Sequence, residues 1–187
     1  MKSLSPLGID APQETVHRKA MLKEMMKTIL MALILFAAIR TVVHSSEIQG
    51  ISMEPNMHTE QRIIVNKATY WFGEPQRGDI VVFDTPSKDI IHRIAGLPGE
   101  WVEIRNGKLF INGEQAEEPY IQGDSISARL QRVPDEHYFI VGDNREASRW
   151  DLVPQGDIIG KAWICYWPPS EWGTSPNYSQ QAYALAE

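Results

Sequence analysis

Apolar residues occur in two different patterns along this chain. Near the N-terminus, residues 28–39 read TILMALILFAAI, an almost purely apolar run that continues through Arg40 to Val43. After residue 50, apolar residues come in short runs separated by glycine, proline and asparagine. A long continuous run is typical of a buried or membrane-spanning helix, and short runs between turn residues are typical of β-strands. The pattern therefore predicts one N-terminal helix followed by a mainly β domain.

The N-terminal run is long enough to cross a bilayer as a helix. From Met25 to Val43 it has 19 residues, which gives roughly 28 Å at about 1.5 Å per residue, close to a hydrocarbon core of about 30 Å. Lys27 and Arg40 lie near its ends, where long side chains can reach the headgroups. We therefore expect a single transmembrane anchor over residues 25–44. The alternatives are a cleavable signal peptide and a buried core helix.

The basic residues around the run predict its orientation. Arg18, Lys19, Lys23 and Lys27 lie just before the continuous apolar stretch that begins at residue 28. After Arg40 the next basic residue is Arg62. By the positive-inside rule, residues 1–24 stay in the cytoplasm and the domain lies on the extracytoplasmic face of the cytoplasmic membrane. The first 17 residues are polar, and we expect them to be irregular.

The second part of the chain predicts strands joined by tight turns. Seven segments have strand character: residues 62–67, 79–83, 89–94, 101–105, 108–112, 138–142 and 158–167. Asn106-Gly107 is a strong two-residue hairpin signal, and Asn112-Gly113 is a second turn. We expect a β domain over residues 45–168, a hairpin-rich lobe at 100–135 and a flexible tail at 169–187.

Composition excludes several kinds of site. The net charge of −6 argues against a nucleic-acid partner. Cys165 is the only cysteine, so no internal disulfide can form, and the five histidines lack metal-ligand spacing. We therefore expect no metal and no organic cofactor. No feature of the sequence indicates an oligomeric state.

Two short segments carry candidate chemistry. In GISMEP, residues 50–55, Ser52 lies in a turn bounded by Gly50 and Pro55, where its hydroxyl can be exposed and nearby backbone N–H groups can bind an oxyanion. In DIIHRIAGLPGE, residues 89–100, His92 interrupts an apolar strand. A strand histidine is more often a packing residue than a catalyst, so neither segment is decisive alone.

Read together, the segments form a recognisable series. GISMEP, RIIVNK, GDIVVF, IIHRIAGLPGE and VGDNREAS follow one another in this order. The series resembles the successive motifs of the type I signal peptidases, membrane-bound serine proteases that remove signal peptides from exported proteins. The resemblance covers about residues 25–168 and implies a signal-peptidase-like β domain. It also implies that Ser52 is the nucleophile and that His92 stands where bacterial members usually carry a lysine base.

The resemblance also implies a set of substrate-binding residues around Ser52. They come from the nucleophile turn and from the GDIVVF and VGDNR segments, and they are Gly50, Ile51, Met53, Pro55, Val82 and Gly142. Because Gly50 has no side-chain donor, the oxyanion hole is expected to rest on backbone N–H groups, chiefly that of Ser52.

The sequence departs from the family in its catalytic segments. Imidazole has an unperturbed pKa near 6.5 and is a competent base at neutral pH, so a Ser-His pair is chemically sufficient. Endoplasmic-reticulum signal peptidases have serine and histidine at these positions. The segment after VGDNR is about four residues shorter than in bacterial members. Asp151 and Asp143 are therefore alternative carboxylates for orienting His92, a further alternative is that no carboxylate fills this role, and Ser148 matches a serine that supports the base.

The expected activity is cleavage of signal peptides from exported preproteins, with small residues at the first and third positions before the cut. Three alternatives are an anchored protein that binds signal peptides without cleaving them, a specialised processing peptidase with few substrates, and a self-cleaving repressor domain. The anchor and the lack of an N-terminal DNA-binding region argue against the last. Expected partners are signal peptides and membrane lipid. Residues 70–72, YWF, fit either a membrane interface or core packing.

Overall fold

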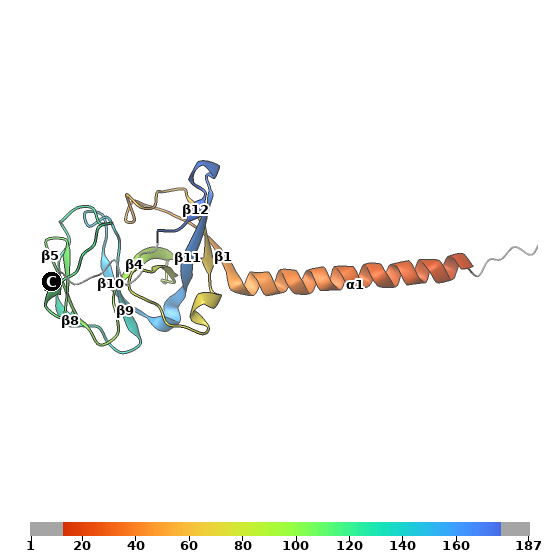
Figure 1. The fold of residues 1–187 in the computed structure, drawn as a ribbon, viewed down its shortest axis with the longest axis horizontal. Coiled ribbons are helices and arrows are strands. Elements are labelled where there is room, and N and C mark those ends of the chain that lie inside the picture. The colour runs from red at the N-terminus through yellow and green to blue at the C-terminus, as the bar shows by residue number, and fades with distance from the viewer. Residues whose placement is uncertain (1–12, 177–187) are drawn as a thin grey trace, which may run out of the picture. The chain divides into compact units, whose positions relative to one another are not determined.

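The computed structural model describes residues 13–176, and the chain divides into two compact units, residues 1–41 and 42–187. The helix α1 (Gln13–Val42) forms the first unit, and all the strands belong to the second (Figure 1).

Helix α1 is long and apolar enough to cross a membrane between His17 and Val42. Its leucine, isoleucine, methionine and phenylalanine side chains are exposed, as expected of a helix surrounded by lipid. The helix begins at Gln13, so the expectation that all of residues 1–17 are irregular is wrong for its last five residues. It ends at Val42, because Val43 already pairs with Asn66 in a sheet.

The main sheet has eight strands and only antiparallel pairs. Its strands are β1 (Val43–Glu47), β2 (Arg62–Asn66), β3 (Ile80–Phe83), β4 (Ile90–Gly96), β9 (His137–Val141), β10 (Trp150–Pro154), β11 (Ile158–Trp167) and β12 (Gly173–Thr174). The order is β1-β2-β11-β3-β4-β9-β10, and β12 pairs with β11. Strands β3, β4 and β9 are almost wholly buried, which explains their continuous apolar sequences.

A second, four-stranded sheet falls within the 100–135 segment. Its strands are β5 (Trp101–Arg105), β6 (Lys108–Ile111), β7 (Glu114–Gln115) and β8 (Ala128–Arg132), in the order β7-β6-β5-β8. Asn106 and Gly107 both have positive φ, 48° and 75°, the geometry that the Asn-Gly signal predicts. Val102 and Leu109 share a buried cluster with Phe139 of β9, so the two sheets have a common core.

The mainly β fold with one N-terminal apolar helix is confirmed. The structure adds strands that apolar patterning does not show, namely β1, β7, β8, β10 and β12. Strand β8 reads ARLQR and is mostly exposed, and β10 lies at the edge of the main sheet, so neither needs a long apolar run. Three short 3₁₀ helices complete the fold: η1 (Ala68–Tyr70), η2 (Gln155–Asp157) and η3 (Pro169–Glu171).

The structure bears on two expectations about short segments, the C-terminal tail and the YWF segment at residues 70–72. Residues 169–176, assigned by sequence to a flexible tail, contain η3 and β12, and the remainder of that tail, 177–187, lies outside the described residues. In the YWF segment, the Tyr70 hydroxyl donates to Asp79, whereas Trp71 is 54% exposed and Phe72 is 97% exposed. Core packing therefore does not account for Trp71 and Phe72.

Candidate active site

A cleft of about 430 Å³ brings together three segments that lie far apart in the sequence. One wall is the end of β1 with the turn that follows it, and a second is the entrance of β4. Ala147 and Arg149 line the cleft from the loop between β9 and β10. Ser52 and His92 both line this cleft, so the fold brings the two expected catalytic residues to one site.

The Ser52 turn is fixed to the core by the methionines that flank it. The Glu54 N–H donates to the Ile51 carbonyl at 3.2 Å, and the Met57 N–H donates to the Met53 carbonyl at 3.0 Å. Met53 and Met57 are each 1% exposed and belong to one buried cluster. Their burial holds the backbone around Ser52 while the serine itself stays partly accessible.

The segment VGDNR packs directly behind Ser52. The Asn144 N–H donates to the Ser52 carbonyl at 2.9 Å, and the Asn144 side chain donates to the Ile51 carbonyl at 3.1 Å. A Cβ atom at Gly142 would collide with the Ser52 carbonyl oxygen and with the side chain of Ser148. The Ser148 hydroxyl accepts from the Gly142 N–H at 2.7 Å and donates to the Arg149 carbonyl at 3.0 Å.

His92 is held in the middle of β4, opposite Val81 of β3. Only 8% of it is exposed, and burial lowers the pKa of its imidazole from 6.5 to about 4. The Phe83 ring lies 6.1 Å from the imidazole, centroid to centroid. The His92 Nδ1 atom has no hydrogen-bond partner among the described residues. The imidazole is therefore neutral at pH 7, but no carboxylate orients it.

The two carboxylates that could orient His92, those of Asp143 and Asp151, form hydrogen bonds with other groups. Asp143 is 1% exposed, and the Arg93 guanidinium donates to its two oxygens at 2.8 and 2.6 Å. The Asn56 amide also donates to Asp143, at 2.8 Å. Asp151 is exposed on β10, and its carboxylate accepts from the Leu152 N–H at 2.8 Å. Neither carboxylate hydrogen-bonds to His92.

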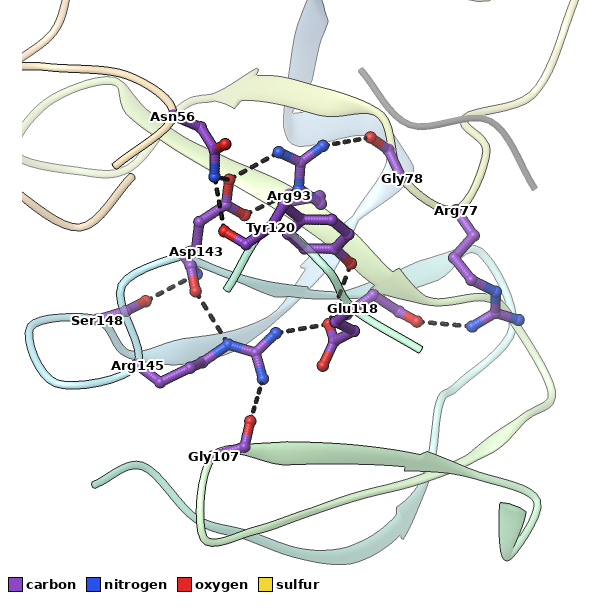
Figure 2. Close-up of polar contacts among 12 residues, drawn as sticks. Asn56, Arg77, Gly78, Arg93, Gly107, Glu118, Tyr120, Asp143, Arg145 and Ser148 are labelled. Carbon is purple, nitrogen blue, oxygen red and sulfur yellow. Dashed lines mark hydrogen bonds and ion pairs between the residues drawn. The ribbon is translucent and has the colours of Figure 1, made fainter. Parts of the chain in front are cut away.

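Figure 2 shows that Asp143 belongs to a larger polar cluster, which sequence reasoning did not anticipate. Arg145 is 1% exposed and donates to the carbonyls of Gly142 and Gly107 and to the Glu118 carboxylate. The Arg93 guanidinium lies over the Tyr120 ring at 4.2 Å from its centroid. The only sequence signal was the group of charges in GDNR, which lies in a turn where solvated charges are common.

The expected substrate-binding residues do not all reach the cleft. Ile51, 51% exposed, and Met53 line it, whereas Gly50 and Pro55 are exposed outside its lining. Val82 is fully buried in the core, and Gly142 is buried behind Ser52. Within residues 13–176, no group of three or more His, Cys, Asp or Glu side chains is placed to hold a metal ion.

Comparison with known proteins points to one family. The family model described as signal peptidase, peptidase S26, matches residues 22–167. A signal peptidase I from Leptolyngbya laminosa is 38% identical over 176 residues, which cover 84% of this chain and 87% of that protein. Signal peptidase I S from Bacillus subtilis (strain 168) is 36% identical and covers 84% of this chain and 96% of its own length. A crystal structure of a signal peptidase I from Enterococcus faecalis V583 is 31% identical over 48% of this chain and 97% of that chain, with a TM-score of 0.38.

Proposed function

Because the chain belongs to the signal peptidase family, peptidase S26, and is thereby a serine peptidase of the signal peptidase I type, we propose that it removes signal peptides from exported preproteins with Ser52 as nucleophile and His92 as general base. The observation that carries the assignment of these two residues is their place in one cleft, although 40 positions separate them in the sequence.

Burial leaves His92 free to accept a proton before the reaction but also lowers its proton affinity, with its pKa at about 4. A general base must be unprotonated before the reaction, and burial keeps the imidazole neutral at pH 7 without help from another charge. In the proposed reaction, the Ser52 hydroxyl attacks the carbonyl before the cleaved bond and passes its proton to His92. His92 then gives that proton to the leaving amine. A water molecule, deprotonated by His92, attacks the acyl-enzyme, and His92 returns the proton to Ser52 Oγ as the ester bond breaks.

Backbone geometry supports the oxyanion hole expected from the sequence. The N–H of Ser52 makes no hydrogen bond within the described part of the chain, whereas the Ser52 carbonyl is held by Asn144. A turn fixed through its carbonyl with a free N–H at the nucleophile can donate to the developing oxyanion without reorganisation.

The orientation of His92 calls for a partner that binds with the substrate or moves. Asp151 is the better candidate, because Asp143 is already saturated by Arg93 and Asn56. Ser148 supports the site indirectly, because its hydroxyl fixes the Gly142 N–H directly behind Ser52.

The apolar helix α1 supports both the proposed substrate, a signal peptide, and the proposed location at the membrane. We propose that α1 holds the chain in the cytoplasmic membrane with its N-terminus inside, so that the cleft acts on the extracytoplasmic face. Signal peptides are themselves apolar segments that enter the bilayer, so an anchored protease and its substrate share one membrane.

The test is cleavage of a purified preprotein by the detergent-solubilised chain. The parent should cleave it, Ser52→Ala should not, and His92→Ala should reduce the rate by a factor on the order of 10² to 10⁴, the usual contribution of a positioned base. Asp151→Asn and Asp143→Asn in the same assay compare the two carboxylates. A parent that binds the preprotein without cleaving it would favour the binding-protein alternative, and less than a tenfold loss in folded His92→Ala would reject His92.

A further inference from the structure

The Ser52 turn has one polar link to the rest of the site that its expected chemistry does not use. Asn56, four residues after the nucleophile, directs both N–H groups of its amide to acceptors on other segments. One N–H donates to the Asp143 carboxylate at 2.8 Å and the other to the Tyr120 carbonyl at 2.7 Å. Figure 2 shows the amide lying between these two acceptors.

The first acceptor leads to the strand that carries the base. Asp143 accepts both from Asn56 and from Arg93, and Arg93 follows His92 directly in β4. Asp143 and Arg93 are each 1% exposed, so this link is shielded from water and has little room to adjust. A short chain of contacts therefore runs from the Ser52 turn through Asn56, Asp143 and Arg93 to the backbone of His92.

The second acceptor leads to the smaller sheet. Tyr120 lies in the connection between β7 and β8, is 3% exposed, and has its ring under the Arg93 guanidinium. By binding its carbonyl, Asn56 ties the nucleophile turn to both sheets at once. Serine and alanine are too short to span these two acceptors, and aspartate has no N–H to offer either of them.

The separation of Ser52 and His92 makes such a link useful. An imidazole is a short, rigid base, so its nitrogens cannot move far enough to stay within hydrogen-bond distance of a serine that has shifted. A misplacement of about 1 Å can lower the rate by a factor on the order of 10². The backbone bond from Asn144 fixes Ser52 from behind, but it does not involve β4. The Asn56 amide reaches Asp143, whose carboxylate is bonded directly to β4 through Arg93.

We propose that Asn56 is a positioning residue, whose amide bridge to Asp143 and Tyr120 sets the separation of Ser52 and His92 for proton transfer. This inference rests on the proposed function, because it assigns Asn56 a part in the same reaction. Asn56 touches neither the substrate nor the reacting atoms in this scheme.

The experiment compares cleavage by the full chain and by Asn56→Ala, with Asn66→Ala as the matched control. Asn66, like Asn56, lies outside the cleft lining, but its side chain makes one local contact, accepting from the Ala68 N–H at 3.0 Å, and does not bind Asp143 or Tyr120. Asn56→Ala should lower kcat roughly 10- to 100-fold with KM nearly unchanged, since the serine and the base are misaligned by a fraction of an ångström. Asn66→Ala should lower the unfolding temperature without changing kcat.

A second variant separates positioning from simple stability. Asn56→Asp keeps the size of the side chain but sets a carboxylate against Asp143. Protonation of the new carboxyl at low pH restores one donor, so cleavage relative to the parent should recover as the pH falls from 8 to 5. The comparison is made at a temperature where the variant stays folded from pH 8 to 5, so that a gain in stability alone would not raise kcat. A kcat within twofold of the parent in Asn56→Ala, or an equal loss in Asn66→Ala, would overturn the proposal.

Hydrogen exchange keeps the two proposals distinguishable. In Asn56→Ala, the amides of Met57 and Asn144 should exchange faster than in the parent, whether or not the chain cleaves, because both belong to the contacts that hold the turn. Unchanged exchange at both amides would overturn the bridge itself. A parent that fails to cleave, tested beside Ser52→Ala, would instead contradict the proposed function.

Discussion

His92 is a buried imidazole whose Nδ1 atom has no hydrogen-bond partner within residues 13–176, and both facts bear on its proposed role as a base. A histidine in a surface loop, with a pKa near 6.5, would change its charge between about pH 5 and 8. Here desolvation penalises the charged form, so the imidazole stays neutral in the free protein well below pH 6.5. The same desolvation makes the imidazolium costly during the reaction, which is why a carboxylate or a substrate dipole beside Nδ1 would have most effect in the transition state.

This environment predicts the acidic limb of kcat/KM. From the unperturbed pKa of imidazole, the limb is expected between about pH 5.5 and 7.5. Burial lowers the pKa of His92 to about 4, so activity should persist to lower pH and fall only as the pH drops toward 4. The measurement is kcat/KM from pH 3.5 to 8 in detergent.

Unfolding controls are needed in the same range. The folded-state pKa lies below the unfolded value, so between about pH 6.5 and 4 the unfolded chain binds a proton at His92 that the folded chain does not, and stability falls as the pH falls. The unfolding midpoint must therefore be followed at each pH. An acidic limb above pH 6 in a protein that stays folded would show that His92 is not the group being titrated.

At the scale of elements, local signals predicted the strands that are buried and missed those that are not. The segments around β3, β4 and β9 are continuous apolar runs because both faces of these strands are covered. Strand β8 presents arginine and glutamine to solvent, and no periodicity in ARLQR marks it as a strand. Sequence motifs singled out Ser52 and His92, and the structure places both in the lining of one cleft. The contacts of Asn56 and Arg145 include groups that lie far away in the sequence. The fold brings these groups close, and no local sequence pattern predicts which groups they are.

The Asn106-Gly107 turn joins the smaller sheet to the polar cluster and offers a test at this scale. Gly107 has φ 75°, and a Cβ there would meet the Asp124 Cα at 2.6 Å and the Gly123 carbonyl at 2.8 Å. Gly113 has φ 93° with nothing within 4 Å of the same position. Both Gly→Ala changes pay for positive φ, about 1 kcal/mol, but only Gly107→Ala also displaces backbone. Gly107→Ala should therefore lower the unfolding temperature clearly more than Gly113→Ala.

The same pair reports on the active site. The Gly107 carbonyl accepts from Arg145 at 2.6 Å, and Arg145 also binds the Gly142 carbonyl behind Ser52. Cleavage by Gly107→Ala should fall below that of Gly113→Ala at a temperature where both are folded. Equal unfolding temperatures for the two variants would contradict the crowding at Gly107.

At the scale of the whole molecule, the apolar run bears on where the proposed chemistry would take place. The exposed apolar helix has no protein partner among the described residues, so lipid is the environment that suits it. The net charge of −6 does not predict the direction of insertion, whereas the basic residues between Arg18 and Lys27 do, because orientation follows lysine and arginine near the span.

The orientation can be read with protease added to intact spheroplasts that express the chain with a tag at each end. The region after Ser46 should be degraded and the N-terminal tag protected, and lysis should expose both tags. Alkaline extraction should leave the full chain in the membrane fraction. An N-terminal tag that is digested in intact spheroplasts would mean that the domain faces the cytoplasm, and recovery of a shortened chain in the supernatant would favour a cleaved signal peptide.

The contact of Gly142 with the Ser52 carbonyl has a consequence for recombining this protein with its relatives. The turn at 50–57 and the loop at 142–148 fit each other without space for a single methyl group. A chimera that takes one segment from this chain and the other from a relative with a longer loop would inherit the Ser52 turn without the loop that packs against it. The two segments lie some 90 positions apart in the sequence, but they must be exchanged together. We therefore expect that active hybrids of this peptidase will take both segments from the same parent.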